Sequence, residues 1–230
     1  MGIYTDAGWF LPHLRGERMS DFCPAATGKS LIPNTPAPPG VLIVPDFLSA
    51  SLCLAWCQYF RSEQQVPLEV QNVDAFEKNS EIAFEKHSGR ITKAVDYKEK
   101  KQEILKEVTR GFSECVMPYF NTQLAAFEKP TVLRYEAGGR YDPHSDNEFW
   151  DAKTQAWQKT LNRDYSILIY LNEDYEGGKL AFPNFLCKVT PRTGMLVAFP
   201  SDHRYLHAAE PLISGERFAV VSWASKTKLA

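Results

Sequence analysis

After Pro130 the chain consists of short runs rich in strand-forming residues, separated by turn residues. There are eight such runs: TVLRYE, RYDPHSD, YSILIYLN, GKLAF, CKVT, GMLVAFP, RYLHAAE and ERFAVVSWA. Eight short strands at this spacing, following a helical segment, indicate a sandwich or jelly roll that helices cover on one side. We therefore predict a mainly β fold with flanking α-helices and a jelly-roll core over residues 131–230.

The preceding part, residues 41–130, is expected to be helical support for this core. VLIVPDF is predicted to be a strand, and Ser49 or Ser51 can cap a helix over LCLAWCQYFRSE. Cys53 and Cys57 are spaced as small apolar residues on one face of that helix. A long amphipathic helix is predicted from Tyr97 to about Phe127, because apolar residues recur there at helical spacing. Its apolar stripe is Ile104, Val108, Phe112, Val116 and Tyr119.

Residues 1–40 are predicted to be an irregular N-terminal arm, because proline and glycine cluster there without any sustained period. Residues 41–230 would then form a single domain. Met19 is a second plausible start, so the sequence leaves open whether residues 1–18 belong to the native chain.

Two further segments are predicted to be loops that could cover a site. The first, Val66 to Thr92, is polar and aperiodic and has His87 and Arg90 as candidate contacts, with Lys93 just beyond it. The second, NEFWDAKTQAWQKTLNRDYS, contains Trp150 and Trp157.

Composition excludes several functions. The 26 basic and 28 acidic residues give a net charge of −2 with a pI near 6.2, so no general field attracts nucleic acid or anionic membranes. No apolar run is long enough to span a bilayer, and a cytoplasmic protein is expected. The five cysteines show no CxxC pair, which argues against a disulfide framework and a zinc ribbon. The oligomeric state remains open.

Three residues have the types and spacing of a metal site. His144 and Asp146 lie two apart, and alternate residues of a strand share a face. If the chain reverses around Leu212 to Gly215, a simple hairpin register places His207 opposite Arg217. His203 has no such counterpart. The spacing therefore favours His207 over His203 as a ligand.

Two imidazoles and one carboxylate form the facial triad that suits non-haem Fe(II), with positions left for a chelating co-substrate and O2. An arginine beside it could hold the far carboxylate of a dicarboxylate by paired hydrogen bonds. A cupin-like metal protein or sensor without turnover is the alternative from a different class. Such a site would have no need of Arg217.

Four stretches resemble the iron(II)- and 2-oxoglutarate-dependent dioxygenases, specifically the prolyl 4-hydroxylase-like branch. They are YEAGGRYDPHSD, IYLNEDYEGGKLAFP, PRTGMLVAFP and HAAEPLISGERFAVVSW, which together extend over about residues 131–225. The resemblance implies a double-stranded β-helix with Fe(II) held by His144, Asp146 and His207. It also implies that Arg217 and Tyr170 bind the 5-carboxylate of 2-oxoglutarate and that Tyr135 lies near the metal-chelating end.

The expected activity is hydroxylation of an unactivated C–H bond, with succinate and CO2 as co-products. Arg163 and Trp223 match positions that contact the target residue in protein prolyl hydroxylases, and Tyr141 could line the same pocket. A prolyl residue of a protein or peptide is therefore the first expectation for the substrate. A free amino acid or a small biosynthetic intermediate is the alternative, because the same scaffold serves both.

Overall fold

The computed structural model describes residues 37–68, 70–71, 84–85 and 89–226, and the predicted arm over 1–40 lies almost wholly outside them. Two antiparallel sheets face each other. The larger contains, in spatial order, β1 (Leu42–Val44), β16 (Leu196–Pro200), β12 (Tyr165–Tyr170), β19 (Arg217–Ser225), β8 (Thr131–Tyr135), β6 (Lys93–Val95) and β2 (Gln65–Pro67), with β7 (Ala126–Phe127) paired to β19. The smaller contains β15 (Cys187–Val189), β14 (Leu180–Phe182), β17 (His207–Ala209), β9 (Arg140–His144) and β5 (Arg90–Ile91). This is the predicted double-stranded β-helix, and all eight predicted runs contain a strand.

The remaining elements are short additions and a helical layer. Three pairs of strands stand apart: β10 (Glu148–Asp151) with β11 (Ala156–Lys159), β13 (Glu176–Gly177) with β18 (Leu212–Ser214), and β3 (Val70–Gln71) with β4 (Phe84–Glu85). The helices are α1 (Ala50–Ser62), η3 (Lys98–Lys100), α3 (Lys101–Arg110), the π-helical η4 (Gly111–Val116), α4 (Met117–Tyr119), η5 (Pro183–Phe185) and η6 (His203–Tyr205). None of the described helices is long and apolar enough to cross a membrane.

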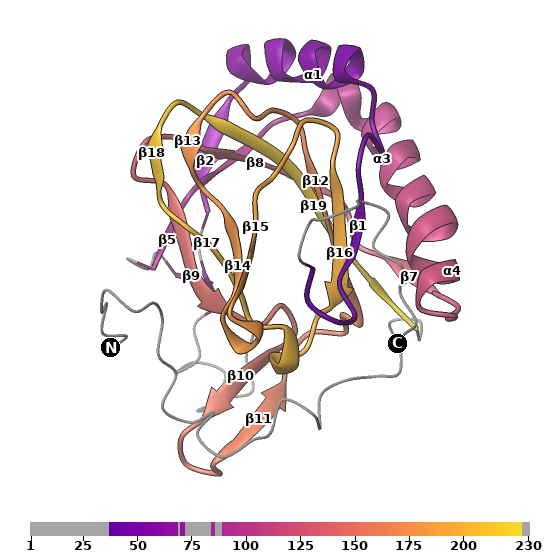
Figure 1. Cartoon of the computed structure of the whole chain (residues 1–230), viewed down its shortest axis with the longest axis vertical. Helices are drawn as coiled ribbons and strands as arrows, with labels where there is room; N and C mark the ends of the chain where they lie inside the picture. The colour runs from indigo at the N-terminus through magenta and orange to yellow at the C-terminus, as the bar shows by residue number, and fades with distance from the viewer. Residues whose placement is uncertain (1–36, 69, 72–83, 86–88, 227–230) are drawn as a thin grey trace.

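The helical layer covers only the outer face of the large sheet (Figure 1). Ser49 caps α1 by accepting a hydrogen bond from the Leu52 amide, as the sequence predicted. Cys53 and Cys57 are buried on its inner face, and the predicted stripe of α3 and η4 is buried from Ile104 to Val116. Each fully buried side chain of this size contributes about 1.5–3 kcal/mol to stability. The layer therefore holds the sheet rigid behind the cavity.

Strand alternation divides the large sheet between this core and an internal cavity. Along β19, Phe218 and Val220 pack in the core under the helices, whereas Arg217, Ala219 and Val221 line the cavity. Because successive side chains of a strand point to opposite faces, one strand can both attach the helices and supply site residues. The cavity therefore lies between the two sheets.

The predicted helix over 97–127 is too long. Helical structure ends at Tyr119, and Asn121 has a φ of 47°, the left-handed conformation that commonly ends a helix. The chain then joins the end of the large sheet, where the Ala125 amide donates to the Ser225 carbonyl at 2.8 Å. Phe127 stacks on Phe112 at 5.2 Å. Backbone pairing along β19 therefore overrides the helical pattern of these last residues.

Both predicted loops contain strands. The segment from Val66 to Thr92 contributes to β2 and forms β5, and the segment after Asp146 forms the β10–β11 hairpin with Trp150 opposite Trp157. Strands of two to four residues are too short to show a clear alternation in the sequence. His87 lies outside the described residues.

The predicted hairpin register between His207 and Arg217 is also wrong. His207 pairs with His144 in the small sheet, whereas Arg217 pairs with Tyr135 in the large one. Between them, β18 pairs with β13, so the chain passes from one sheet to the other. Both side chains still reach one cavity because the two sheets face each other.

Candidate metal and co-substrate site

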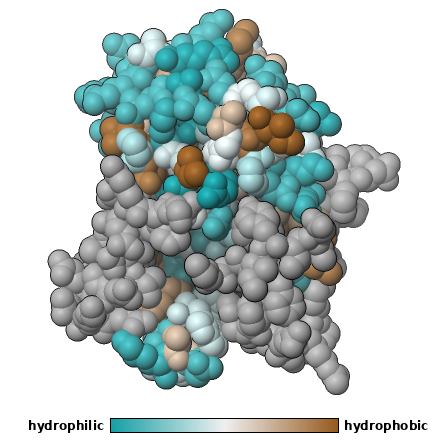
Figure 2. Space-filling model, turned by 90° about the vertical axis from the view of Figure 1, so that its left-hand side faces the viewer, coloured by the Kyte–Doolittle hydropathy of each residue, from teal (hydrophilic) through white to brown (hydrophobic). Residues whose placement is uncertain are grey.

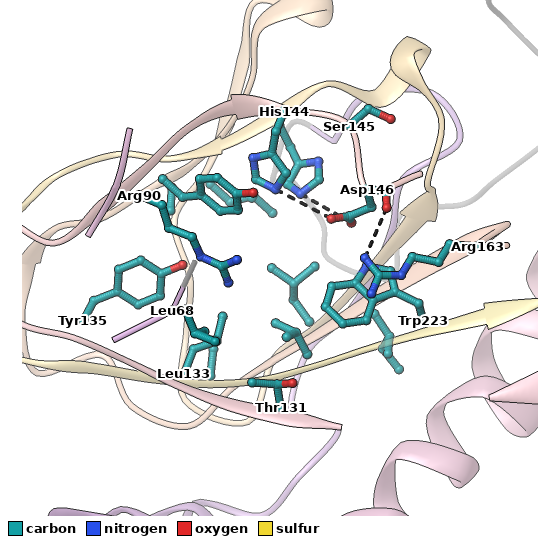
Figure 3. A pocket seen from close by; sticks show the side chains of 18 of the residues that line it. Leu68, Arg90, Thr131, Leu133, Tyr135, His144, Ser145, Asp146, Arg163 and Trp223 are labelled. Carbon is teal, nitrogen blue, oxygen red and sulfur yellow. Dashed lines mark hydrogen bonds and ion pairs between the residues drawn. The ribbon is translucent and has the colours of Figure 1, made fainter. Parts of the chain in front are cut away.

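The space between the sheets is a cavity of about 580 Å³. It is lined from the large sheet by inward residues of β8, β12 and β19, and from the small sheet by β9, β14 and β17. All nine residues that the sequence analysis selected line it: Tyr135, Tyr141, His144, Asp146, Arg163, Tyr170, His207, Arg217 and Trp223. Figure 3 shows His144 and Asp146 at one wall, with Arg163 and Trp223 together beside them.

Three potential metal ligands converge at that wall. His144 ends β9 and His207 begins β17, and the pairing of these strands makes the two histidines register partners. Asp146 lies just beyond β9, with its carboxylate oxygens 3.6 Å from Nε2 of each histidine. The three ligand atoms lie within 4.8 Å of one another, the only such group of three among the described residues.

Backbone carbonyls orient both imidazole rings. Nδ1 of His144 lies 2.8 Å from the Asp142 carbonyl, and Nδ1 of His207 lies 3.1 Å from the Tyr205 carbonyl. A carbonyl accepts only, so each Nδ1 carries the proton and each Nε2 presents a lone pair to the centre. This tautomer is the one that metal ligation through Nε2 requires.

The protonation states also suit metal binding. Burial, with a contribution from His144, lowers the pKa of His207 from 6.5 to about 4, so its imidazole is neutral near pH 7. Burial alone would raise the pKa of Asp146, but His207, His144 and the Ser166 hydroxyl outweigh it and lower that pKa well below its usual range. The site therefore holds a carboxylate and a neutral imidazole, the forms that bind a cation.

Two serines that the sequence analysis did not select support Asp146. The Ser166 hydroxyl donates to its Oδ2 at 2.5 Å, and the Ser201 hydroxyl lies 2.8 Å from that of Ser166. The Asp146 amide also donates to the Ser201 carbonyl at 3.1 Å. Ser166 could have been noticed as the one serine in the mainly apolar run YSILIYLN.

Arg217 is a buried cation at the other end of the cavity. Arg217 is only 2% exposed, and its Nε has no hydrogen-bond partner among the described residues. One NH group donates to the Gly178 carbonyl, and the guanidinium lies 4.1 Å from the centre of the Tyr135 ring and 5.9 Å from that of Tyr170. Within the described part of the chain no carboxylate forms an ion pair with it. A buried, uncompensated guanidinium is the environment that an anionic ligand requires.

Tyr175 is another residue at this end that the sequence analysis missed. Its hydroxyl is buried and has no hydrogen-bond partner among the residues described. Burial raises its pKa to about 12 despite the charge of Arg217, so the hydroxyl stays protonated and able to donate. The Nε–H of Arg217 and the Tyr175 hydroxyl are therefore two hydrogen-bond donors without a partner among the described residues.

Gly178 allows Arg217 to take this position. Its φ of 62° suits the tight bend that the sequence predicted for Gly177 and Gly178. A Cβ at Gly178 would lie 3.2 Å from NH1 of Arg217 and 2.6 Å from Cδ1 of Leu212.

His203 lies apart from the three convergent residues. Its Nδ1 is 2.7 Å from the Glu148 carboxylate, and its ring is parallel to that of Trp157 at 4.9 Å. It begins η6, and the Asp202 side chain caps that turn by accepting from the Arg204 amide. The structure thus places His207, and not His203, beside His144 and Asp146.

Arg163 and Trp223 form one unit near the candidate ligands. The guanidinium lies 3.7 Å above the Trp223 ring and makes two hydrogen bonds, of 2.6 and 2.7 Å, to the Glu128 carboxylate. It also donates to the Asp146 carbonyl at 3.2 Å. Arg163 is therefore not a solvated loop charge, because it is paired with Glu128 and stacked on Trp223. These contacts hold the indole ring as a wall of the cavity.

Tyr141 stacks on the imidazole ring of His144. The two rings stack at 3.6 Å with an interplanar angle of 20°, and the Arg90 guanidinium lies 4.5 Å above the Tyr141 ring. Burial raises the Tyr141 pKa to about 12, so it remains a neutral phenol. Its position fixes the plane of the His144 imidazole.

Comparison with known proteins finds a family that resembles the cavity-forming part of the chain. Residues 130–225 match the family described as the 2OG-Fe(II) oxygenase superfamily. This part of the chain is therefore similar to that superfamily. The match spans the cavity-lining strands β8, β9, β12, β14, β17 and β19, and includes every candidate site residue.

Among curated relatives, human prolyl 3-hydroxylase 3 is 40% identical over an alignment of 89 residues. The alignment covers 35% of this chain and 12% of that protein. A putative prolyl 4-hydroxylase of Acanthamoeba polyphaga mimivirus is 31% identical over 127 residues, 51% of this chain and 52% of that one. The chain therefore spans about half, or less, of the length of these relatives.

A solved structure shares the fold. It is a prolyl hydroxylase from Trichoplax adhaerens in complex with a hypoxia inducible factor oxygen degradation domain peptide fragment. It matches 81% of this chain and 84% of its own, with a TM-score of 0.57 and 22% sequence identity. The structural similarity thus extends over most of the chain and includes part of the region before residue 130.

The residues present fit the groups that this superfamily uses. Two imidazoles and a carboxylate suit Fe(II), and the uncompensated Arg217 with the Tyr175 hydroxyl suits the far carboxylate of 2-oxoglutarate. Both lie in one cavity, so a single bound co-substrate can contact the metal with one end and Arg217 with the other.

Proposed function

We propose that the protein is an Fe(II)- and 2-oxoglutarate-dependent dioxygenase that hydroxylates a prolyl residue of a protein or peptide. The observation that carries the proposal is the buried Arg217, uncompensated among the described residues, in the same cavity as His144, Asp146 and His207. A cupin-like protein that only binds a metal would leave the cost of burying this guanidinium unbalanced.

The substrate assignment is supported by the relatives. The matched proteins include prolyl 3-hydroxylases and a putative prolyl 4-hydroxylase, and the compared Trichoplax structure is a prolyl hydroxylase bound to a peptide fragment. The aromatic wall formed by Trp223 under Arg163 offers an apolar surface on which a proline ring can pack. Because both 3- and 4-hydroxylases match, the position of the new hydroxyl group is left to product analysis.

The chain contributes binding, orientation and shielding. His144, Asp146 and His207 would hold the iron, and Arg217 with Tyr170 and Tyr175 would orient 2-oxoglutarate, while Tyr135 lies beside Arg217. When bound, the iron and its co-substrate supply the oxidation of the C–H bond with O2, yielding succinate and CO2. Leu133, Leu168 and Leu180 line the rest of the cavity and keep bulk water from the reacting groups.

Anaerobic reconstitution tests the proposal. Fe(II) and 2-oxoglutarate together should give the weak visible charge-transfer band of their chelate in wild type, and His207→Ala should lose it. Proline-containing peptides should then gain one oxygen atom in the presence of O2, with one succinate formed for each hydroxylation. Iron binding without the band would instead favour a metal-binding or sensor protein. Turnover of free amino acids but of no peptide would favour the small-molecule alternative.

The formal charge of −2 supports the further expectation that neither nucleic acid nor an anionic membrane is a partner, and a cytoplasmic location remains a prediction.

A further inference from the structure

A second hollow of about 360 Å³ adjoins the cavity, and we call it the side groove. Its walls include Pro67, Leu68, Arg90, Lys93, Arg134 and Glu136. Three of these residues, Pro67, Leu68 and Arg90, also line the main cavity, so the two spaces are neighbours that meet at these side chains. Figure 3 shows Arg90 and Leu68 on the side of the cavity opposite Arg163 and Trp223. The side groove therefore lies next to the cavity in which the target residue would lie.

The groove lies where the chain crosses between the two sheets. β5 is an edge strand of the small sheet and β2 an edge strand of the large one, and β6 follows β5 after the single residue Thr92. Val66 on β2 and Ile91 on β5 are exposed to 54% and 47%, and they are two of the six exposed large hydrophobic residues in the described part of the chain. Figure 2 shows this side of the molecule, with separate apolar patches in a hydrophilic surface above a hollow. Exposed apolar side chains beside a groove are typical of a binding surface.

The charge of the groove is mainly positive. Arg90, Lys93 and Arg134 line it, with Glu136 as the one acidic residue among its described lining residues. Glu136 is shared, since it pairs with Lys93 at 2.7 Å and with Arg134 at 3.4 Å. Arg134 also pairs with Glu216 at 2.8 Å, so Lys93 is the more available of these two cations. The Lys93 and Glu136 side chains are exposed to 38% and 45%, so their pair can open toward a ligand at little cost.

We propose that the side groove binds an acidic residue of the polypeptide substrate, next to the residue that is hydroxylated. The inference rests on the proposed function. A free amino acid would end within the main cavity, whereas a polypeptide must leave it and continue along the surface. The adjoining groove offers that path, and the cations in its walls, Lys93 above all, complement a carboxylate on the emerging chain.

The test compares peptides that differ only in charge. Each peptide contains one proline and one test residue, which is glutamate, glutamine or lysine. The test residue is placed in turn at each position near the proline, on either side of it. The full chain with Fe(II) and 2-oxoglutarate is assayed for kcat/KM, and peptide binding is measured separately by fluorescence anisotropy. We expect glutamate on one side of the proline to raise kcat/KM about tenfold over lysine, with the preference declining as salt is added.

Two variants locate the effect. Lys93→Glu should abolish or invert the preference, and Lys93→Met should weaken it. Lys100→Glu is the matched control: its side chain is exposed to 30% and pairs with Glu103 at 3.0 Å, but it lies before α3 on the outer, helical side. This control should keep the wild-type preference. Melting temperatures of the three variants show whether each is folded.

The outcomes separate this inference from the proposed function. Peptides hydroxylated with equal efficiency whatever their charge, or an unchanged preference in Lys93→Glu, would overturn the groove assignment and leave the activity intact. Acidic peptides that bind wild type but not Lys93→Glu, without turnover, would support the groove and contradict the prolyl hydroxylase activity. If free glutamate displaced the bound peptide as strongly as the acidic peptide does, the groove would be a site for a small anion, and the polypeptide assignment would be overturned. Absence of both binding and turnover would overturn it as well.

Discussion

His144 and His207 are register partners on adjacent strands of the small sheet, with ring centres 4.3 Å apart. Their Nε2 atoms each lie 3.6 Å from an oxygen of Asp146. Strand pairing alone thus brings together two residues far apart in the sequence. The backbone pairing of β9 and β17 sets this separation.

His207→Ala should weaken Fe(II) binding by at least about 100-fold, since even the loss of a supporting contact to a ligand costs 10–100-fold. His203→Ala should keep most of the affinity, because His203 contacts Glu148 and Trp157 away from the convergent residues. Anaerobic titration with Fe(II), followed by the 2-oxoglutarate band, measures both. If the two variants behaved in the opposite way, the ligand assignment would be wrong.

Ser166→Ala should reduce iron affinity by about 10–100-fold, because the Asp146 carboxylate would lose the hydroxyl that orients it. Ser222→Ala is the matched control, since its buried hydroxyl donates to a backbone carbonyl, that of Glu128, at 2.8 Å. Both variants should lose similar stability in urea unfolding, but only Ser166→Ala should lose metal affinity. Equal iron affinities in the two variants would show that Ser166 has only a structural role.

Arg217→Ala should raise the 2-oxoglutarate concentration needed for half-maximal activity by about 100-fold, the usual cost of removing one partner of a buried charge pair. The concentration of Fe(II) required should change far less, because Arg217 contacts none of the three candidate ligands. Steady-state kinetics with each component varied in turn separates the two. An unchanged requirement for 2-oxoglutarate would mean that another residue holds its far carboxylate.

The metal-free protein should lose stability as the pH falls from about 6.5 toward 4. The folded pKa of His207, about 4, lies below its ordinary value of 6.5, so the unfolded chain binds more protons in this range. Folding stability contributed by the neutral imidazole is therefore present above pH 6.5 and decreases below it. Asp146 acts in the same direction only at lower pH, because its folded pKa is depressed below that of an ordinary carboxyl.

Urea unfolding of the apoprotein at several pH values tests this expectation. His207→Gln should flatten the dependence of the unfolding free energy between pH 6.5 and 4, because glutamine does not titrate. His203→Gln serves as the control for removing an imidazole elsewhere, and it should retain the wild-type contribution from His207. A wild-type slope in His207→Gln would assign the pH dependence to other groups.

The sequence by itself determined the fold class and the chemistry of the site. Alternation in runs such as YSILIYLN and ERFAVVSWA predicted the strands, and the nine residues assigned to the site from the sequence are all among those that line the cavity. The residue types alone indicated a ligand set for Fe(II) and a cation for a carboxylate. These properties are local along the chain, since periodicity and residue type do not depend on distant contacts.

Only the tertiary structure decided how these residues meet. The hairpin register predicted for His207 and Arg217 was wrong, because β18 carries the chain from the small sheet to the large one between them. The support of Asp146 by Ser166 and the neutralisation of Arg163 by Glu128 also join segments that no local pattern connects. The physical reason is that strand order and facing sheets, set by burial of the whole core, determine which side chains share a cavity.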